Sequence, residues 1–390
     1  MILTGPQSMI PVSVLTGFLG SGKTTVLNHL VRSQQMNRAL VVINEFGAVG
    51  LDHDLIARSN EDMVVEMMGG CLCCTIRGDL AATLRDAPWR FARNGICWFD
   101  RVVIETTGLA DPAPILHTLM VDQRLQSLYR IDGVIATVDA AAGMATLDTQ
   151  EESVRQAAVA DRILLTKTDL VDAAERAKIE QRLRVLNPAA EIIPAVHGKV
   201  DLASLLDIGL YNPQTKSLDV QRWLAAEAYP SSHRHHDHGH GDSNAHAHDH
   251  DHAHDHHDIN RHDARIQATC LTFDTPLVPE AFDRWLDILM SFRGRDILRV
   301  KGILNLEGEP LPVVVHGVQH IFHPPVRLDA WPSDDRRTRM VFITRDVSAE
   351  DLKGTLSLLT EGLDKFGLEG LVNNVSAGGL VTDPAIGAWG

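Results

Sequence analysis

The sequence lacks any apolar run of the roughly 20 residues that a helix needs to cross a bilayer. The first ten residues, from Met1 to Ile10, contain neither the basic region nor the apolar stretch of a signal peptide. Positive charge is also scarce, because 36 Lys and Arg stand against 51 Asp and Glu and give a formal net charge of −15. Nucleic acids and anionic membranes attract basic surfaces. We therefore expect a cytoplasmic protein with no nucleic-acid partner and no membrane partner.

Cysteine is rare as well, and its distribution is uneven. Three of the five cysteines lie in Cys71-Leu72-Cys73-Cys74, whereas Cys97 and Cys270 stand alone. Such a pattern is not a disulfide framework, and in a cytosolic protein a tight cluster is typical of metal-binding or redox sites. We expect Cys97 and Cys270 to be packing residues.

The length and composition favour two domains, because 390 residues with 44% apolar content exceed the usual size of one domain and can form sizeable cores. In the first half, short β-branched runs alternate with helical patterns, which predicts an α/β fold with a mainly parallel sheet. The predicted strands are 10–15, 39–43, 63–66, 101–104, 133–138, 163–165 and 191–194. The predicted helices are 24–33, 79–93, 112–118, 150–158 and 172–187.

A histidine-rich tract separates the two halves. Between His233 and His262, 13 of 30 residues are histidine, and such a segment cannot form a packed core. We expect a first domain at 9–228, a disordered linker at 229–263, a small α+β domain at 264–362 and a loose tail at 363–390. Strands of the second domain are predicted at 264–273, 297–306, 313–318 and 340–344, and helices at 280–291 and 349–359.

The strongest motif is the run Gly17-Phe18-Leu19-Gly20-Ser21-Gly22-Lys23-Thr24, which follows a predicted strand and opens a predicted helix. This order indicates a phosphate-binding loop, in which backbone N–H groups and the helix dipole surround a polyphosphate. Lys23 would reach the β- and γ-phosphates, and the Thr24 hydroxyl would hold Mg²⁺. The expected nucleotide contacts in this loop are Gly17, Gly20, Ser21, Gly22, Lys23, Thr24 and Thr25.

Polar motifs also follow other predicted strands, at the sheet edge where a ligand binds. In Thr166-Lys167-Thr168-Asp169, the Asp169 carboxylate can accept hydrogen bonds from the ring N–H and the exocyclic amine of guanine, a pair that adenine does not offer. We therefore expect Thr166, Lys167 and Asp169 to bind the base of GTP; the alternative is a helix cap formed by Asp169.

Two glutamates end neighbouring predicted strands. Glu105 would face the Mg²⁺ ion, often through water, because Mg²⁺ keeps several of its waters; the alternative is a charge that faces solvent. Gly108 would let the switch segment that follows move with the γ-phosphate. Glu45 is a candidate for orienting the attacking water, and its alternative is a structural turn. Lys23, Glu45 and Glu105 are thus the catalytic candidates.

Cys71, Cys73 and Cys74 form the candidate transition-metal site, because thiolates bind Zn²⁺ tetrahedrally and three of them leave one position open. Such an open site suits transfer of a metal. The spacing does not distinguish Zn²⁺, Co²⁺ and Cu⁺, although thiolates favour softer ions. Redox thiols or buried inert thiols are the alternatives. The histidine tract is interpreted as a metal reservoir, or else as a solvated spacer.

Taken together, these residues resemble the CobW family of GTPases, within the metallochaperone group that includes UreG and HypB. The resemblance spans roughly residues 9 to 360, and it rests on the histidine tract and on these segments: Gly17–Thr24, Asn44–Gly47, Gly70–Cys74, Glu105–Gly108, Thr166–Asp169 and Val315–Phe322. It implies a P-loop GTPase domain, a CobW C-terminal domain and slow GTP hydrolysis with Mg²⁺. Many relatives carry a Glu where this chain has Ala48, which leaves the fourth metal ligand open.

The resemblance also implies that the metal, most often zinc, passes from the Cys motif to a client metalloprotein. Other members are linked to cobalt in cobalamin synthesis or to nitrile hydratase. We therefore expect a GTPase that transfers zinc or cobalt in a GTP-dependent way, with the C-terminal domain recognising the client. The sequence leaves open whether the protein forms a homodimer. The alternatives are a metal-storage or sensor protein tuned by nucleotide, and a small-molecule kinase that uses the same phosphate loop.

Overall fold

The computed structural model describes residues 9–45, 64–68, 74–206, 208 and 265–356. For Asn44, Glu45, 64–68 and 74–77 it describes the backbone alone. Cys71, Cys73, Ala48, the histidine tract and the tail at 363–390 lie outside the described residues. The expected domain boundaries at 228 and 263 lie outside them too.

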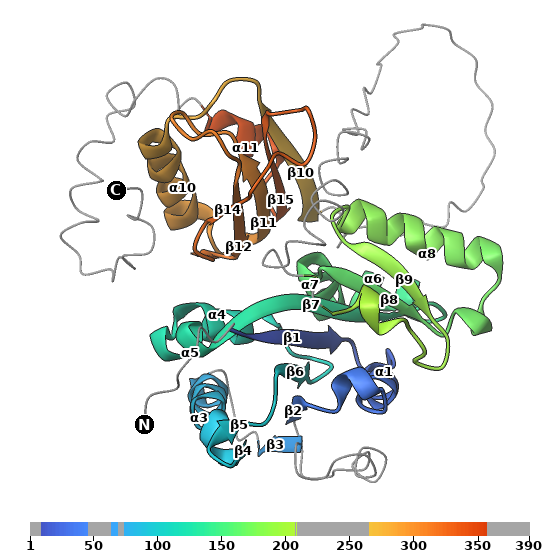
Figure 1. The fold of residues 1–390 in the computed structure, drawn as a ribbon. Coiled ribbons are helices and arrows are strands. Elements are labelled where there is room, and N and C mark those ends of the chain that lie inside the picture. Colours follow the sequence, from blue (N-terminus) through green and yellow to red (C-terminus); the bar gives the residue numbers. More distant parts are fainter. Residues whose placement is uncertain (1–8, 46–63, 69–73, 207, 209–264, 357–390) are drawn as a thin grey trace, which may run out of the picture.

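A seven-stranded parallel sheet forms the first domain (Figure 1), and each of its strands overlaps one predicted from the sequence. The strand order is β3-β2-β6-β1-β7-β8-β9, so that β1 lies at the centre. Most strands are buried on both faces, as continuous apolar runs lead one to expect. The strands are β1 (Ile10–Gly17), β2 (Ala39–Glu45), β3 (Val64–Met68), β6 (Arg101–Thr106), β7 (Tyr129–Asp139), β8 (Arg162–Thr166) and β9 (Glu191–Ala195).

The five helices predicted for this domain are present, but α3 begins five residues earlier than expected, at Cys74. The sequence analysis missed α5, α6 and the β4–β5 hairpin, which are all seven residues or shorter and carry a weak periodic signal. The helices are α1 (Lys23–Val31), α3 (Cys74–Arg90), α4 (Ala113–Val121), α5 (Gln123–Leu128), α6 (Gly143–Thr149), α7 (Glu151–Val159) and α8 (Ala173–Leu186). The short elements are β4 (Ala92–Arg93), β5 (Ile96–Cys97), η1 (Gln34–Met36), η3 (Thr168–Leu170) and η4 (Leu202–Ser204).

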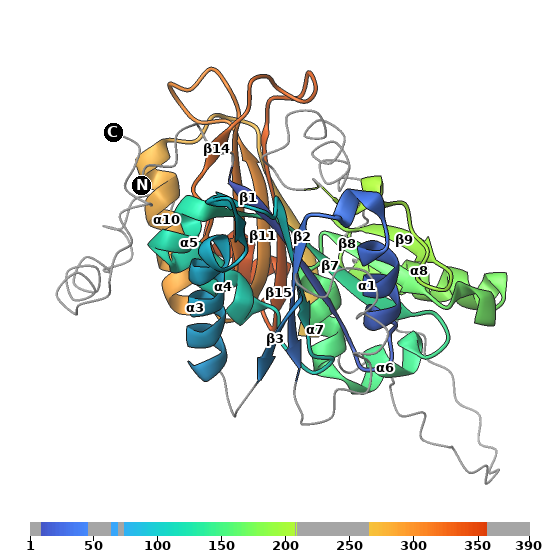
Figure 2. The same cartoon turned by 60° about the horizontal axis from the view of Figure 1, so that its bottom comes forward.

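The two faces of the parallel sheet are covered differently (Figure 2). Helix α1 packs Val26, Leu27 and Leu30 against one face, where Leu202 and Leu205 of the η4 region join the same apolar cluster. Helices α3, α4 and α7 cover the opposite face and contribute to a larger cluster. The sheet is therefore enclosed on both faces, and the polar residues of the predicted nucleotide site lie at its strand ends.

The second domain is a small α+β unit, as predicted. Its antiparallel sheet has the order β10-β15-β11-β12-β13, with β14 paired to β12. Helix α10 packs Trp285 against Phe342 of the sheet, with ring centroids 6.1 Å apart. The elements are β10 (Ile266–Phe273), α10 (Pro279–Arg293), β11 (Ile297–Leu304), β12 (Val313–Val318), β13 (Ile321–Phe322), β14 (Val326–Arg327), β15 (Thr338–Arg345) and α11 (Ala349–Gly354).

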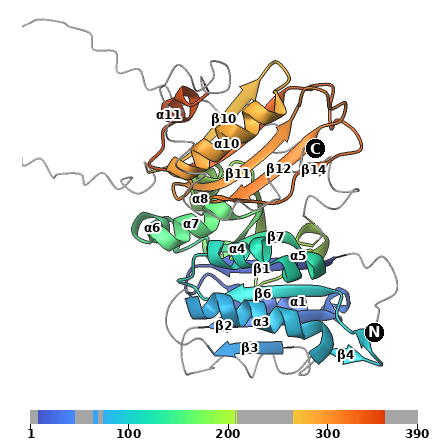
Figure 3. The same ribbon diagram turned by 90° about the vertical axis from the view of Figure 1, so that its left-hand side faces the viewer.

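The face of the antiparallel sheet opposite α10 packs on the first domain (Figure 3). Ile266, Leu298, Val318 and Ile343 belong to the same apolar cluster as the helices of the parallel sheet. The register of β11 shifts between Ile297 and Arg299, which marks a bulge. A bulge interrupts the strict alternation of a strand, so Leu298 and Arg299 can both meet the first domain.

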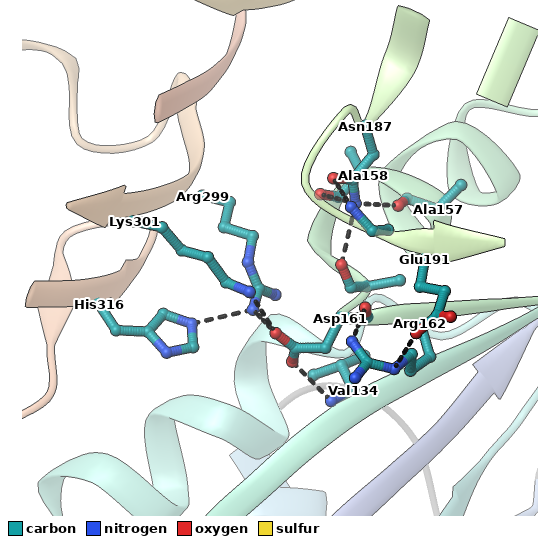
Figure 4. A network of polar contacts seen from close by, with 12 residues as sticks. Val134, Ala157, Ala158, Asp161, Arg162, Asn187, Glu191, Arg299, Lys301 and His316 are labelled. Atoms are coloured by element: carbon teal, nitrogen blue, oxygen red, sulfur yellow. Dashed lines mark hydrogen bonds and ion pairs between the residues drawn. The ribbon is translucent and has the colours of Figure 1, made fainter. Parts of the chain in front are cut away.

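A buried carboxylate stands at the centre of this domain interface (Figure 4). Asp161, in the turn between α7 and β8, accepts a hydrogen bond from the backbone N–H of Val134 at 2.9 Å. It also pairs with Arg299, and with Lys301 Nζ at 2.7 Å. Burial by itself raises the pKa of Asp161, but the two cations hold that pKa well below its usual range. The two domains are thus joined by charge as well as by apolar packing.

Two histidines flank the same cations. His316 Nε2 lies 3.0 Å from an Arg299 guanidinium nitrogen, and the ring of His323 is 5.5 Å from the ring of His316. Burial, and then the charge of Arg299, lowers the pKa of His316 well below its usual value and that of His323 to about 4. Both rings are therefore neutral in the folded protein at pH 7.

We predict that the free energy of unfolding falls as the pH is lowered from about 6.5 towards 4. In this range the unfolded chain protonates these histidines, whereas the folded protein, with its lowered pKa values, binds fewer protons. The histidines contribute their full stabilisation at pH values above their pKa in the unfolded chain. This stabilisation is lost as the pH falls towards their lower pKa in the folded protein. The His323 ring should account for about 1 kcal/mol at pH 5. Denaturant unfolding at pH 7 and pH 5 measures it.

The variant His323→Gln should reduce the loss of stability between pH 7 and pH 5. An equal pH dependence in the wild type and His323→Gln would contradict the prediction.

Within the described part of the chain, none of the helices combines the length and apolar character required to traverse a bilayer.

Candidate functional site

The glycine-rich loop between β1 and α1 has the backbone of a phosphate-binding loop. Gly17, Gly20 and Gly22 have φ angles of 142°, 72° and 94°, which L-residues with a Cβ rarely adopt. The loop closes through a hydrogen bond from the Ser21 N–H to the Phe18 carbonyl at 3.1 Å. Helix α1 then begins at Lys23, so its first N–H groups face the loop. The predicted strand, turn and helix are all present.

Neighbouring strands hold the loop in place. The Ser21 and Thr137 hydroxyls are 2.6 Å apart, and the Thr166 hydroxyl donates to the Ser21 carbonyl at 2.7 Å. A Cβ on Gly17 would lie 2.2 Å from the Thr137 hydroxyl oxygen, so only glycine fits there. The loop is thus clamped by the ends of β7 and β8.

Lys23 is buried, and its ammonium group lies along the loop. Its Nζ donates to the carbonyls of Gly17 and Phe18, at 2.9 and 3.2 Å. The positive charge therefore stands beside the backbone N–H groups that would receive a phosphate, where it would add to the field of the helix dipole.

Thr24 and Glu105 meet although 81 residues separate them. The Thr24 hydroxyl, in the first turn of α1, donates to Glu105 Oε1 near the end of β6 at 3.4 Å. A hydroxyl and a carboxylate side by side are oxygen donors of the kind that Mg²⁺ binds through one or two protein ligands and several waters. The arrangement fits the magnesium site expected from the sequence.

The residues expected to bind the base also lie together. Lys167 adopts a left-handed conformation, with φ of 54°, and its Nζ is 2.6 Å from Asp139 Oδ2. Asp169 follows in η3, and its Oδ2 lies 4.0 Å from the His197 Nε2. The helix-cap alternative for Asp169 does not hold, because α8 is capped by Asp172, with Glu175 completing a capping box.

Two contributors to this side of the site were missed by the sequence analysis. Asp139 ends β7 and fixes Lys167, and the turn Val196–Lys199 follows β9. A Cβ on Gly198 of that turn would lie 2.6 Å from the Thr25 carbonyl, so the turn rests on the start of α1. Both follow strands that the sequence predicts, so the polar and glycine residues at the ends of these two strands carried the signal.

The backbone of β2 and β3 leads to the same edge of the sheet. Asn44 is paired with Thr106 and Glu45 with Met68, so β2, β3 and β6 end side by side. Cys71 and Cys73 lie in the segment between Met68 and Cys74, outside the described residues. Among the residues that are described, no group of three or more His, Cys, Asp or Glu could hold a metal ion. Cys97, predicted to be a packing residue, lies against the main apolar cluster.

Family models match most of the described chain. Residues 11–194 match the model of the CobW/HypB/UreG nucleotide-binding domain. Residues 266–359 match the model of the cobalamin synthesis protein CobW C-terminal domain. The chain belongs to the CobW family. Its P-loop GTPase core and its antiparallel C-terminal domain are those of this family.

Relatives and a solved structure agree with this assignment. The chain is 30% identical over 348 residues to the zinc chaperone YjiA of Escherichia coli, covering 89% of this chain and 98% of YjiA. It is 30% identical over 370 residues to the zinc chaperone CobW of Pseudomonas aeruginosa, covering 87% and 88%. The crystal structure of Zn(II)-bound YjiA GTPase from E. coli aligns with a TM-score of 0.61 at 26% identity, covering 91% of this chain and 100% of YjiA.

We predict that Gly17→Ala strongly destabilises the loop, because the new methyl group would overlap Thr137 at a φ of 142°. The free energy of unfolding should fall by about 2–3 kcal/mol. Gly20→Ala is the matched control, since no atom lies within 4 Å of its Cβ position and only its φ of 72° opposes the change; it should cost about 1 kcal/mol. Thermal unfolding of both variants measures this, and equal losses would contradict the role of Thr137.

Proposed function

We propose that this CobW-family protein is a GTP-hydrolysing metallochaperone. It binds GTP with Mg²⁺ at the phosphate loop, holds zinc or cobalt at the Cys-x-Cys-Cys motif, and passes the metal to a client metalloprotein in a GTP-dependent way. The observation that carries the proposal is the 3.4 Å contact between Thr24 and Glu105 at the mouth of the loop. This contact supports the proposal because it brings a hydroxyl and a carboxylate, oxygen ligands of the kind that Mg²⁺ binds, together beside the phosphate loop.

Each residue of the site has a distinct task in this proposal. Lys23 turns from its carbonyl partners to the β- and γ-phosphates and offsets their charge. Thr24 and Glu105 hold the Mg²⁺ ion, which, when bound, neutralises charge that develops on the phosphate oxygens. Glu45 ends the neighbouring strand β2 and is proposed to orient the attacking water.

Guanine selection is assigned to the far side of the loop. Asp169 accepts hydrogen bonds from the guanine ring N–H and amine, while Lys167, fixed by Asp139, lies beside the base. Thr166 supports the loop from below through the Ser21 carbonyl. The end of β8 therefore contacts the phosphate loop and leads directly into the residues proposed to bind the base.

Metal is the cargo in this proposal. Cys71, Cys73 and Cys74 follow β3, whose last residue, Met68, pairs with Glu45 at the same sheet edge as the Mg²⁺ pair. Nucleotide-dependent movement at this edge would change the geometry of the thiolates and so the affinity for the metal. The names of the relatives, zinc chaperones, support zinc as the first candidate. Because such coupling is reciprocal, the metal must change GTP affinity by the same factor.

We predict that Asp169→Asn weakens GTP binding by about 10- to 100-fold, since two hydrogen bonds to a charged acceptor are lost. The asparagine amide adds a donor that suits the carbonyl of xanthine, so the affinity for xanthosine triphosphate should rise. Asp172→Asn, three residues along, keeps a capping side chain on α8 and should bind GTP normally. Fluorescence titration with both nucleotides measures the change; unaltered guanine selectivity would exclude Asp169 as the base-binding residue.

We predict that the protein binds Zn²⁺ or Co²⁺ tightly and that Cys73→Ser lowers this metal affinity by at least about 100-fold. The metal affinity should also differ between the GTP–Mg²⁺ and GDP–Mg²⁺ states. Competition against a chromophoric chelator measures it, without nucleotide and with each nucleotide. Cys97→Ser is the matched control, because the Cys97 thiol donates a hydrogen bond to the Phe99 carbonyl at 3.3 Å and is not part of the Cys-x-Cys-Cys motif. Lys23→Ala should keep the metal site and lose the nucleotide effect.

The same titration separates the proposal from metal storage. A storage protein would bind metal with the same affinity in all nucleotide states and in Lys23→Ala. Weak binding that is independent of nucleotide and persists in Cys73→Ser would contradict delivery from the Cys motif.

A further inference from the structure

Helix α7 lies between the nucleotide site and the C-terminal domain, and one buried side chain links it to the segment after Glu105. Gln156, which is 1% exposed, donates through Nε2 to the carbonyls of Gly108 and Ala110, at 3.2 and 2.9 Å. These carbonyls belong to residues 107–111, here called the switch segment. A buried amide that holds two backbone carbonyls fixes the path of this segment relative to α7.

The switch segment is also in close contact with the phosphate loop. A Cβ on Gly108 would lie 2.7 Å from the Leu19 backbone nitrogen. Just before the segment and the loop, the Thr106 hydroxyl donates a hydrogen bond to the Thr16 hydroxyl at 2.8 Å. Any displacement of the segment by a γ-phosphate would therefore be felt both in the loop and at Gln156.

A chain of ion pairs runs from the switch segment to the C-terminal domain. Asp111, whose carboxylate accepts a hydrogen bond from the Ala113 N–H at the start of α4, lies 3.8 Å from Arg155. Arg155 pairs with Glu151 at 2.6 Å, one turn earlier on α7. Glu151 pairs in turn with Arg345 of β15 at 2.9 Å. Arg345 belongs to the other domain, so three successive ion pairs join the two.

The far end of α7 is fixed as well (Figure 4). The Asn187 side-chain amide donates to the carbonyls of Ala157, Ala158 and Ala160, at 2.8 to 3.0 Å. Directly after them, Asp161 pairs with Arg299 and Lys301 of β11. Both ends of the helix are thus bound to the C-terminal sheet, and its middle is bound to the switch segment. Rigid helices joined to their surroundings by hydrogen bonds and ion pairs are the kind of element that carries energetic coupling between distant sites.

From these contacts we infer that α7 couples the switch segment to the C-terminal domain, with Gln156 and Arg345 as positioning residues for nucleotide binding. The inference rests on the proposed GTPase function and adds its regulation. The docked C-terminal domain holds α7, and α7 holds the switch segment in the position that receives the γ-phosphate. GDP lacks that phosphate, so docking favours GTP over GDP. By reciprocity, GTP favours docking of the domain that would meet the client.

The experiment uses the full chain and compares the dissociation constants of GTPγS–Mg²⁺ and GDP–Mg²⁺. Arg345→Ala removes the outer ion pair without touching the nucleotide site. It should weaken GTPγS binding by about threefold and leave GDP binding unchanged. Arg327→Ala is the matched control, because Arg327 pairs with Glu309 inside the C-terminal domain, and it should change neither constant.

A second variant tests the inner link. Gln156→Leu should produce the same selective loss for GTPγS, and the double variant with Arg345→Ala should lose less than the product of the two single effects, as expected for one pathway. Fully multiplicative losses, no change in either single variant, or equal losses for GTPγS and GDP would overturn the coupling. Absence of GTPγS binding in the wild type would overturn the proposed function and the coupling together.

Discussion

All strands of the first sheet run in the same direction, so their carboxyl ends meet at one edge, and the nucleotide site depends on this constraint. Thr24 reaches Glu105 because β1 and β6 are neighbours. Ser21 is held by Thr137 and Thr166 because β7 and β8 come next. Residues up to 145 positions apart thereby form one polar surface.

The second domain uses the covered face of that sheet in a different way. It packs on helices α4, α7 and α8 with apolar residues such as Leu298 and Ile343, around a buried carboxylate. Removing one partner of a buried ion pair costs far more than the pair contributes, about 3–5 kcal/mol. Asp161 therefore makes the relative position of the domains specific, and it does so at the end of the helix that carries Gln156. Helix α7 therefore links the stability of the interface between the two domains to the position of the switch segment.

The sequence predicted much of this architecture because its signals are local. Seven parallel strands, five helices and the division into two kinds of domain follow from apolar runs and helical spacing. The short helices α5 and α6 did not, since six or seven residues carry little periodicity. The start of α3 at Cys74 was placed too late, because the run from Cys74 to Gly78 has no apolar repeat. In the site, Gly17–Thr24 and Glu105 were found, whereas Asp139 and Gly198 were passed over.

By itself, the sequence determined the phosphate loop, the polar residues at four strand ends and the cysteine motif. Each of these motifs consists of residues that are adjacent in the sequence. The chemistry expected of each motif follows from its backbone geometry and its side-chain types. Only the tertiary structure decided which of them meet, such as Thr24 with Glu105 and Lys167 with Asp139. It alone placed Gln156 under the switch segment and Arg345 on Glu151. Such contacts join residues far apart in the chain, and no local pattern encodes the strand order and domain packing that bring them together.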